Sequence, residues 1–261
     1  MATYRRGARL GQHFLTAKWA AVSLARSVNV RDDETILEIG PGKGALTREL
    51  LSTKRPVVAI EKDELLVEKL HETFATEISS KQLRIIVGDV RDFSAELEHF
   101  GTYVVAANIP YYITGEIIRQ FLTMNKQPRA MALLIQKEVA QRITSKSESI
   151  LSLSVKAYGI PRIVEKVSRK CFSPAPSVDS AILLIDAVSR DFFTDISEEH
   201  FFAVVHAGFA SKRKFLANNL AVKFGKEAAI QALTDCGVSE KARAENVSLG
   251  EWKRVAMKLK G

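Results

Sequence analysis

The chain has 261 residues, of which 46% are hydrophobic, and a formal net charge of +8. This apolar content supports a folded core and excludes a disordered chain, and the length allows one large domain or two. The positive charge favours a polyanionic partner such as nucleic acid. No apolar run approaches the roughly 20 residues that span a bilayer, so we expect no membrane segment.

The two cysteines, Cys171 and Cys236, have no metal-ligand spacing and predict no framework of disulfides. They fit a reducing, cytoplasmic setting. The first residues carry Arg5, Arg6 and Arg9 with no acidic residue, and they lack the apolar core of a secretion signal. We interpret this stretch as a basic arm.

Short apolar runs alternate with helical patterns over the first two thirds of the chain. In chain order, the pattern predicts a helix at Ala17–Val28, a strand at Thr35–Ile39, a helix at Ala45–Ser52, a strand at Val57–Ile60, a helix at Glu64–Phe74, strands at Leu83–Val87 and Tyr103–Ala107, a helix at Glu116–Leu122 and a strand at Arg129–Ile135. Continuously apolar strands separated by helices indicate a parallel sheet covered on both faces. Two further strands, Ile160–Val167 and Ser180–Ile185, are joined by a loop alone, which predicts an antiparallel pair at the sheet edge.

From about residue 188 the pattern is helical. The predicted helices are Ser197–Ala210, Phe215–Leu220, Lys226–Cys236 and Leu249–Lys260. Ser197 is a typical helix start and Gly237 a typical helix stop. We therefore predict two domains, an α/β domain over residues 1–187 and a smaller helical domain over residues 188–261.

A glycine-rich turn, EIGPGKG at residues 38–44, follows the first predicted strand. Its Gly-x-Gly-x-Gly spacing matches neither the dinucleotide fingerprint nor a phosphate loop. Glu61 ends the next strand about 20 residues further on, where an acid in such folds bonds ribose hydroxyls. Asp89 follows the third strand and could accept the exocyclic amine of an adenine. Taken singly, either acid could instead cap a helix.

The fourth strand ends in Asn108-Ile109-Pro110-Tyr111. The Asn108 side-chain oxygen and the Pro110 carbonyl can each accept one N–H of an amine, and the Tyr111 ring can stack on a base. Alone, the tetrapeptide could be an ordinary turn. However, four strand ends with functional groups share one sheet edge, where parallel sheets bind ligands. Recognition of ribose and adenine without a pyrophosphate site favours S-adenosylmethionine over NAD. These features predict methyl transfer to an amine of a planar base.

Several segments together resemble one family. They are GQHFL at residues 11–15, EIGPGKGALT at 38–47, NIPY at 108–111, QKEV at 136–139, FSPAPSVDS at 172–180, FASKRKFLANNL at 209–220 and RAEN at 243–246. The set is similar to the ribosomal RNA adenine dimethyltransferases of the small-subunit, kasugamycin-sensitivity type, and it covers nearly the whole chain. The last two segments favour this type over the erythromycin-resistance enzymes of the large subunit.

The resemblance implies a seven-stranded, Rossmann-like S-adenosylmethionine-dependent methyltransferase domain with a small C-terminal helical domain. It implies N6-dimethylation of two adjacent adenines in the 3′-terminal hairpin loop of small-subunit rRNA. The substrate would be a pre-assembled small ribosomal subunit, and the enzyme a monomer. The implied cofactor contacts are His13, Leu15, Gly40, Glu61, Asp89 and Asn108. Asn108 and Pro110 would orient the target amine, while Tyr111 and Phe172 would stack on either face of the base.

Two positions depart from the family pattern. The family usually has asparagine where His13 stands, and often asparagine where Tyr112 stands; we expect Tyr112 to pack behind the site. For RNA binding we expect the arm residues Arg5, Arg6 and Arg9 and a second basic run of Lys212, Arg213 and Lys214. The alternative for these residues is a solvated face.

Three other functions compete with this interpretation. The first is large-subunit adenine methylation of the erythromycin-resistance type. The second is a non-catalytic ribosome-assembly or transcription factor that kept the fold, although such a protein need not retain Gly40, Glu61, Asp89 and Asn108. The third, methylation of a small-molecule amine, leaves the basic arm and the helical domain unexplained.

Overall fold

The computed structural model describes residues 12–93 and 100–259. The chain divides into two compact units, Met1–Ala140 with Ile160–Val188 and Gln141–Gly159 with Ser189–Gly261. The sequence placed one boundary near residue 188, whereas this division assigns residues 141–159 to the helical unit. Backbone hydrogen bonds account for the difference: Glu148 N donates to Glu245 O at 2.7 Å, and Ser189 N donates to Tyr158 O at 2.8 Å.

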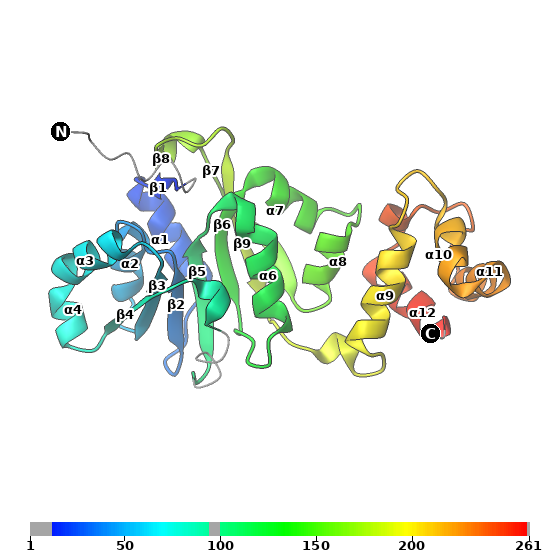
Figure 1. The fold of residues 1–261 in the computed structure, drawn as a ribbon, viewed down its shortest axis with the longest axis horizontal. Helices are drawn as coiled ribbons and strands as arrows, with labels where there is room; N and C mark the ends of the chain where they lie inside the picture. Colours follow the sequence, from blue (N-terminus) through cyan, green and yellow to red (C-terminus); the bar gives the residue numbers. More distant parts are fainter. Residues whose placement is uncertain (1–11, 94–99, 260–261) are drawn as a thin grey trace. The chain divides into compact units, whose positions relative to one another are not determined.

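The first unit is built on a seven-stranded sheet with the order β4-β3-β2-β5-β6-β9-β7 (Figure 1). The strands are β2 (Thr35–Ile39), β3 (Val57–Glu61), β4 (Leu83–Val87), β5 (Tyr103–Asn108), β6 (Met131–Gln136), β7 (Ile160–Val167) and β9 (Ser180–Asp186). The strands from β4 to β6 are parallel, and β9 pairs antiparallel with both β6 and β7. The predicted parallel sheet and its antiparallel edge pair are both confirmed.

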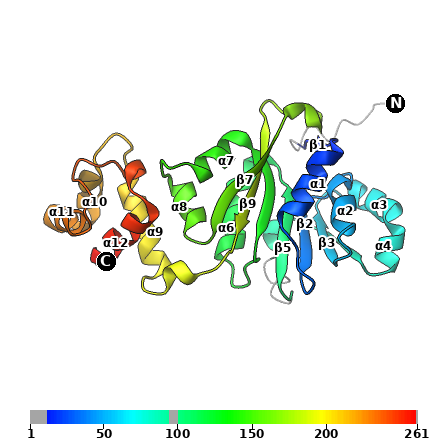
Figure 2. The ribbon, with the colours of Figure 1, turned by 180° about the vertical axis from the view of Figure 1, so that it is seen from behind.

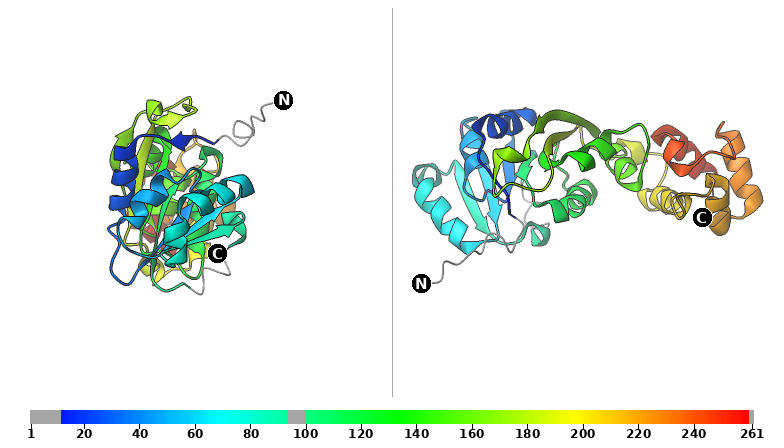
Figure 3. Two further views of the ribbon diagram at one scale, coloured as in Figure 1. Left: turned by 90° about the vertical axis from the view of Figure 1, so that its left-hand side faces the viewer. Right: turned by 90° about the horizontal axis from the view of Figure 1, so that it is seen from above.

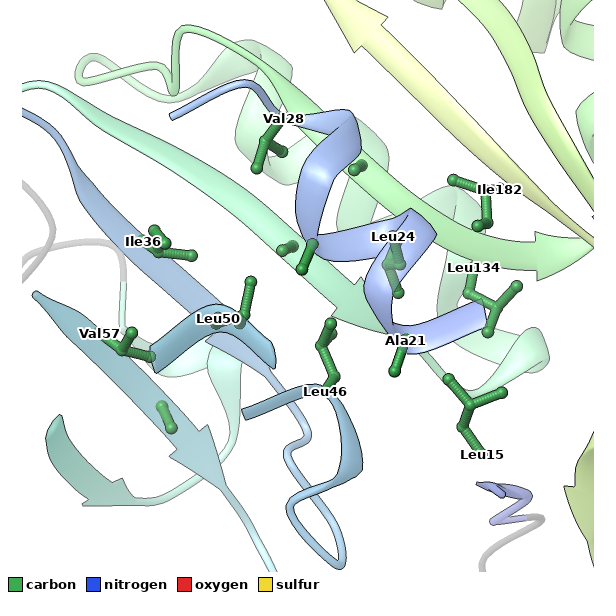
Figure 4. Close-up of a cluster of buried hydrophobic side chains, with 14 of the residues drawn as sticks. Leu15, Ala21, Leu24, Val28, Ile36, Leu46, Leu50, Val57, Leu134 and Ile182 are labelled. Carbon is green, nitrogen blue, oxygen red and sulfur yellow. The ribbon is translucent and has the colours of Figure 1, made fainter. Parts of the chain in front are cut away.

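Helices cover both faces of this sheet, as the continuous apolar strands require. They are α1 (Lys18–Ser27), α2 (Ala45–Leu51), α3 (Glu64–Thr73), α4 (Ala75–Ser79) and α6 (Thr114–Thr123), followed by α7 (Lys137–Thr144). On one face, Ala21 and Leu24 of α1 lie near Leu134 and Ile182 of the sheet, and Leu50 of α2 lies near Ile36 (Figure 4). Viewed from behind and from above, α1 and α6 lie on opposite sides of the sheet (Figures 2 and 3).

A second, two-stranded sheet joins segments that are far apart in the chain. In it, β1 (Phe14–Leu15) pairs antiparallel with β8 (Phe172–Ser173), so that Leu15 lies opposite Phe172. The sequence predicted neither strand, because two residues are too few to show a periodicity. Short 3-10 turns complete the connections: η2 (Val90–Asp92), η3 (Tyr111–Ile113), η4 (Arg169–Cys171), η5 (Asp191–Phe193) and η6 (Ala244–Asn246).

The second unit consists of helices. These are α8 (Ile150–Lys156), α9 (Glu198–Gly208), α10 (Leu216–Phe224), α11 (Lys226–Asp235) and α12 (Leu249–Lys258). Ser197 caps α9 as predicted, since its hydroxyl accepts a hydrogen bond from His200 N at 3.2 Å. Gly237 follows α11 with φ of +72°, as expected for a residue that ends a helix. Within the described residues, every helix is too short or too polar to cross a membrane.

Candidate functional site

A cavity of about 540 Å³ opens at the carboxyl ends of β2, β3, β4 and β5. From β2 the chain adds β3 and then β4 on one side of the sheet, and it then returns to add β5 and β6 on the other side. The order of the strands therefore reverses between β2 and β5. Open parallel sheets bind their ligands at this reversal point. The volume is typical of a pocket for a small organic ligand or cofactor.

Two glycines of the turn after β2 shape the cavity in different ways. Gly40 has φ of +66°, and a Cβ built there would meet nothing within 4 Å, so its backbone faces open space. Gly44, with φ of +79°, comes directly before α2, where a Cβ would lie 2.5 Å from Cε2 of Phe74. Gly40 therefore leaves room for a ligand, whereas Gly44 allows close packing of the turn against Phe74.

Glu61, at the end of β3, is only 4% exposed and is held by backbone amides. Its Oε2 accepts from Gly42 N at 3.0 Å, and its Oε1 accepts from Lys62 N at 2.9 Å and from Asp63 N at 3.0 Å. These bonds fix the carboxylate on the cavity wall and tie the end of β3 to the glycine-rich turn. Each oxygen has lone pairs in two directions, so acceptor capacity remains.

Asp89, after β4, is surrounded by cations. Its oxygens accept from Arg91 Nε at 2.9 Å and Arg91 Nη2 at 2.6 Å, and from Lys62 Nζ at 2.9 Å. The Arg91 guanidinium holds the pKa of Asp89 far below its usual range. Lys62 lowers this pKa further, and partial burial of Asp89 opposes both effects. Asp89 is therefore ionised at neutral pH, and each of its oxygens already accepts two hydrogen bonds, from Arg91 and Lys62.

His13 connects three segments at the mouth of the cavity. Its backbone carbonyl accepts a hydrogen bond from Asn108 Nδ2 at 3.1 Å, and its Nδ1 lies 2.8 Å from the Pro174 carbonyl oxygen. Its ring stacks on Tyr111, with centroids 5.8 Å apart and planes inclined by 30°. The Tyr111 hydroxyl in turn lies 2.7 Å from Ser180 Oγ. His13 thus connects the segment before α1 to the turn after β5 and to the loop that contains Pro174.

Asn108 and Pro110 both line the cavity and have acceptor capacity there. Because Asn108 Nδ2 donates to His13, its Oδ1 remains the free acceptor within the described part of the chain. The Pro110 carbonyl accepts Ile113 N at 3.2 Å, which leaves one of its two lone pairs. The structure therefore brings together all six expected cofactor residues, with Pro110 and Tyr111, around one cavity.

Two aromatic residues lie elsewhere than expected. Phe172 is 5% exposed and belongs to the hydrophobic core, because the pairing of β8 with β1 draws it in beside Leu15. It is not among the residues that line the cavity in this structure. Tyr112, which we expected to pack behind the site, is 71% exposed and lines the cavity instead. That expectation was wrong.

Glu38 is a buried acid among the residues that line the cavity, and the sequence predicted no role for it. It is 1% exposed, and neither of its carboxyl oxygens has a hydrogen-bond partner among residues 12–93 and 100–259. Burial raises the pKa of Glu38 to about 8; nearby Thr47 opposes this in part, and the charge of Glu61 adds to it. A charged residue inside the otherwise apolar strand TILEI was the signal that could have revealed it.

The residues expected to bind RNA lie outside the cavity. Lys212, Arg213 and Lys214 are exposed in the loop between α9 and α10 of the second unit, which we call the basic loop. Arg5, Arg6 and Arg9 lie outside the described residues. The structure thus leaves the basic loop accessible to a polyanion.

The sheet order, the glycine-rich turn and the acids at successive strand ends define a Rossmann-like methyltransferase. A family model described as ribosomal RNA adenine dimethylase matches residues 5–260. The chain belongs to this family.

Curated relatives named ribosomal RNA small subunit methyltransferase A include proteins from the following two organisms. The one from Dehalococcoides mccartyi strain CBDB1 is 37% identical over 258 residues, covering 97% of this chain and 88% of the relative. The one from Fusobacterium nucleatum subsp. nucleatum is 36% identical over 253 residues and covers 94% of both. The chain is therefore similar to these relatives over almost its whole length.

Solved structures share the fold. A dimethyladenosine transferase from Plasmodium falciparum superimposes with a TM-score of 0.80 at 22% identity, over 93% of this chain and 96% of that one. The 23S rRNA methyltransferase ErmE gives a TM-score of 0.76 at 25% identity, over 94% and 99%. Both superpositions extend over more than nine tenths of this chain, so they include the helical domain as well as the methyltransferase domain. The predicted fold class is confirmed.

Proposed function

We propose that this protein transfers methyl groups from S-adenosylmethionine to N6 of two adjacent adenines in the 3′-terminal hairpin loop of small-subunit rRNA. The observation that carries the proposal is the free Oδ1 of Asn108, held at the cavity by the bond from Nδ2 to His13. An acceptor fixed in this way selects an amine. The names of the relatives at 33–37% identity favour the small subunit as the source of that amine.

The cavity residues fit a methyl donor of this kind. Gly40 leaves open space beside the strand end, and Glu61 presents a carboxylate for ribose hydroxyls. Asp89 would accept the adenine amine in exchange for its bond from the exposed Lys62 side chain. His13 and Leu15 complete the set that would hold the cofactor. When bound, S-adenosylmethionine supplies an electrophilic methyl group.

The chain's own contribution is to orient the amine. The lone pair of an adenine N6 is delocalised into the ring, which makes the nitrogen a poor nucleophile. Hydrogen bonds from its two protons to Asn108 Oδ1 and the Pro110 carbonyl favour a more tetrahedral nitrogen, whose lone pair is then available. Such positioning can supply roughly 7–11 kcal/mol of a reaction barrier. A general base is not required, because a methylated, cationic nitrogen readily loses its proton to water.

RNA binding in this proposal rests on phosphate contacts by the basic loop, joined by Arg5, Arg6 and Arg9 of the N-terminal arm. The substrate is a pre-assembled small ribosomal subunit in the cytoplasm, and the protein acts as a monomer. The target base must leave its stack to enter the cavity, as in other enzymes that modify a base.

The test is methyl transfer to purified ribosomal subunits that lack the modification. We expect mass spectrometry to find two adjacent dimethyladenines in the small-subunit RNA and no methylation of large subunits. Methylation of large subunits alone would favour the erythromycin-resistance activity. Failure to bind S-adenosylmethionine in calorimetry, together with no transfer to either subunit, would favour a non-catalytic assembly factor.

A further inference from the structure

Two exposed cations stand beside β1 on segments that are distant in the chain. Lys43 lies in the glycine-rich turn after β2, and Arg169 begins η4, the turn between β7 and β8. In the described part of the chain, neither has an ion-pair partner. By contrast, Lys62 and Arg91, which line the cavity, are both paired with Asp89. Lys43 and Arg169 therefore keep their charge available for an anion from outside the chain.

The Lys43 ammonium is held above the Phe14 ring of β1. Its Nζ lies 4.6 Å from the ring centroid, within the range of a cation–π contact. Phe14 is itself packed closely on the turn, because a Cβ at Gly42 would lie 3.1 Å from two of its ring carbons. An ammonium has three N–H donors, and at most one of them can point at the ring. The contact thus orients Lys43 and leaves at least two donors for an anion.

Arg169 is fixed on the β8 side of β1. Its Nη1 donates to the Ser177 carbonyl at 3.3 Å, and its backbone N donates to Asp179 Oδ1 at 3.0 Å. A guanidinium has five N–H donors in one plane, so four remain for an anion. The turn itself is tied to the end of β1, because Thr16 N donates to the Cys171 carbonyl at 2.8 Å. Arg169 is therefore a second oriented cation beside the same short strand.

Both cations stand at the rim of the cavity. Lys43 and Phe14 line it, and β1 lies beside β8 (Figure 1). His13, just before β1, reaches the Pro174 carbonyl of the loop that follows η4 and β8. A base that enters the cavity stays joined to the phosphates on its two sides, which remain outside. Lysine and arginine are side chains that commonly contact phosphate oxygens, and such contacts fix the register of the nucleic acid.

We propose, on the basis of the proposed function, that Lys43 and Arg169 form a phosphate clamp that holds the RNA backbone beside the extruded adenine. Because Phe14 and Ser177 already limit the motion of the two side chains, less freedom is lost when phosphate binds. Both residues of the clamp belong to the first unit, whereas the basic loop belongs to the second. The clamp sets the position of the strand at the cavity, and it leaves the choice of the amine to other groups.

The test measures affinity for an RNA hairpin with two adjacent loop adenines at several salt concentrations. Each phosphate contact contributes about 0.7–0.9 to the slope of log affinity against log salt. Lys43→Gln and Arg169→Gln should each lose this amount, which is about four- to five-fold in affinity at about 0.15 M salt, and the double variant should lose twice the slope. The matched control is the double variant Lys54→Gln, Lys81→Gln. It removes two exposed charges before the amino ends of β3 and β4, away from the cavity, and should keep the wild-type slope.

A second measurement separates RNA phosphate from the carboxylate of the cofactor, since Lys43 also lines the cavity. Calorimetry should give the same affinity for S-adenosylmethionine in wild type and in every variant. If Lys43→Gln weakens cofactor binding and keeps the wild-type salt slope, Lys43 serves the cofactor and the clamp is overturned. Unchanged slopes in a protein that methylates small subunits would also overturn the clamp, and the proposed function would stand. If wild type methylates neither subunit, the proposed function fails and the clamp fails with it.

Discussion

Replacement of Glu38 by glutamine should change how the stability of the protein depends on pH. The pKa of Glu38 lies at about 8 in the folded protein, against 4.5 for an ordinary glutamate. At about 1.4 kcal/mol for each pH unit, the ionised form in the folded state costs roughly 5 kcal/mol. This is an upper estimate, because water entry and relaxation reduce the cost of a buried charge.

The sign follows from proton binding. The folded state binds this proton more tightly than the unfolded chain, so the contribution of Glu38 to the free energy of unfolding is fully present below pH 4.5, decreases up to pH 8 and is level above. Glu38→Gln keeps the shape and removes the titration. Between pH 5 and pH 8 the variant should therefore gain roughly 3 kcal/mol relative to wild type. Urea unfolding at several pH values measures this difference.

Glu34 provides the control, since it is also buried but is paired with Arg129. Nε and Nη2 of Arg129 lie 2.5 and 3.0 Å from the Glu34 carboxylate. Burial raises the pKa of Glu34, but the hydrogen bonds and charge of Arg129 outweigh this and lower it. Glu34→Gln should therefore destabilise the protein at neutral pH. Parallel stability curves for wild type and Glu38→Gln would refute the view that Glu38 is a protonated carboxyl group.

The same proton should be linked to cofactor binding. A ligand that brings positive charge to the cavity favours ionised Glu38, so wild type should release about 0.9 proton on binding S-adenosylmethionine at pH 7. Calorimetry in buffers of different ionisation enthalpy counts these protons. Glu38→Gln should release none at the same pH; equal release by both proteins would assign the proton to another group.

Four further changes test the cavity and the basic loop. Asn108→Ala should lower kcat about 10- to 100-fold with RNA affinity nearly intact, because it removes one acceptor at the amine; full activity would contradict this role. Gly40→Ala should weaken cofactor binding and lower the free energy of unfolding by about 1 kcal/mol. Gly44→Ala should lower it by several kcal/mol, measured by thermal unfolding, because the new Cβ meets Phe74. Equal losses of stability in the two variants would contradict the different roles of these glycines. Neutralising the basic loop should reduce the slope of log affinity against log salt by up to about 3, and an unchanged slope would exclude phosphate contacts there.

The local pattern of apolar residues was sufficient to predict the strands of the main sheet. All seven predicted runs became strands of one sheet. Five of them, β2, β3, β5, β6 and β9, are apolar runs bounded by turns and are buried almost throughout, whereas β4 and β7 are partly exposed edge strands. The positions of Glu61, Asp89 and Asn108 followed from the same pattern, since parallel strands place their carboxyl ends at one edge. These predictions required no knowledge of long-range contacts.

What the sequence alone determined was therefore the seven strands of the main sheet, the edge that carries the site and most of the residues that lie along it. The tertiary structure decided that residues 141–159 group with the helical unit, that Phe172 is core, that Tyr112 is exposed and that Glu38 holds its proton. Each of these outcomes depends on segments distant in sequence, such as the pairing of Leu15 with Phe172. Burial is set by whatever packs against a side chain, and local periodicity carries no information about a partner more than a hundred residues away.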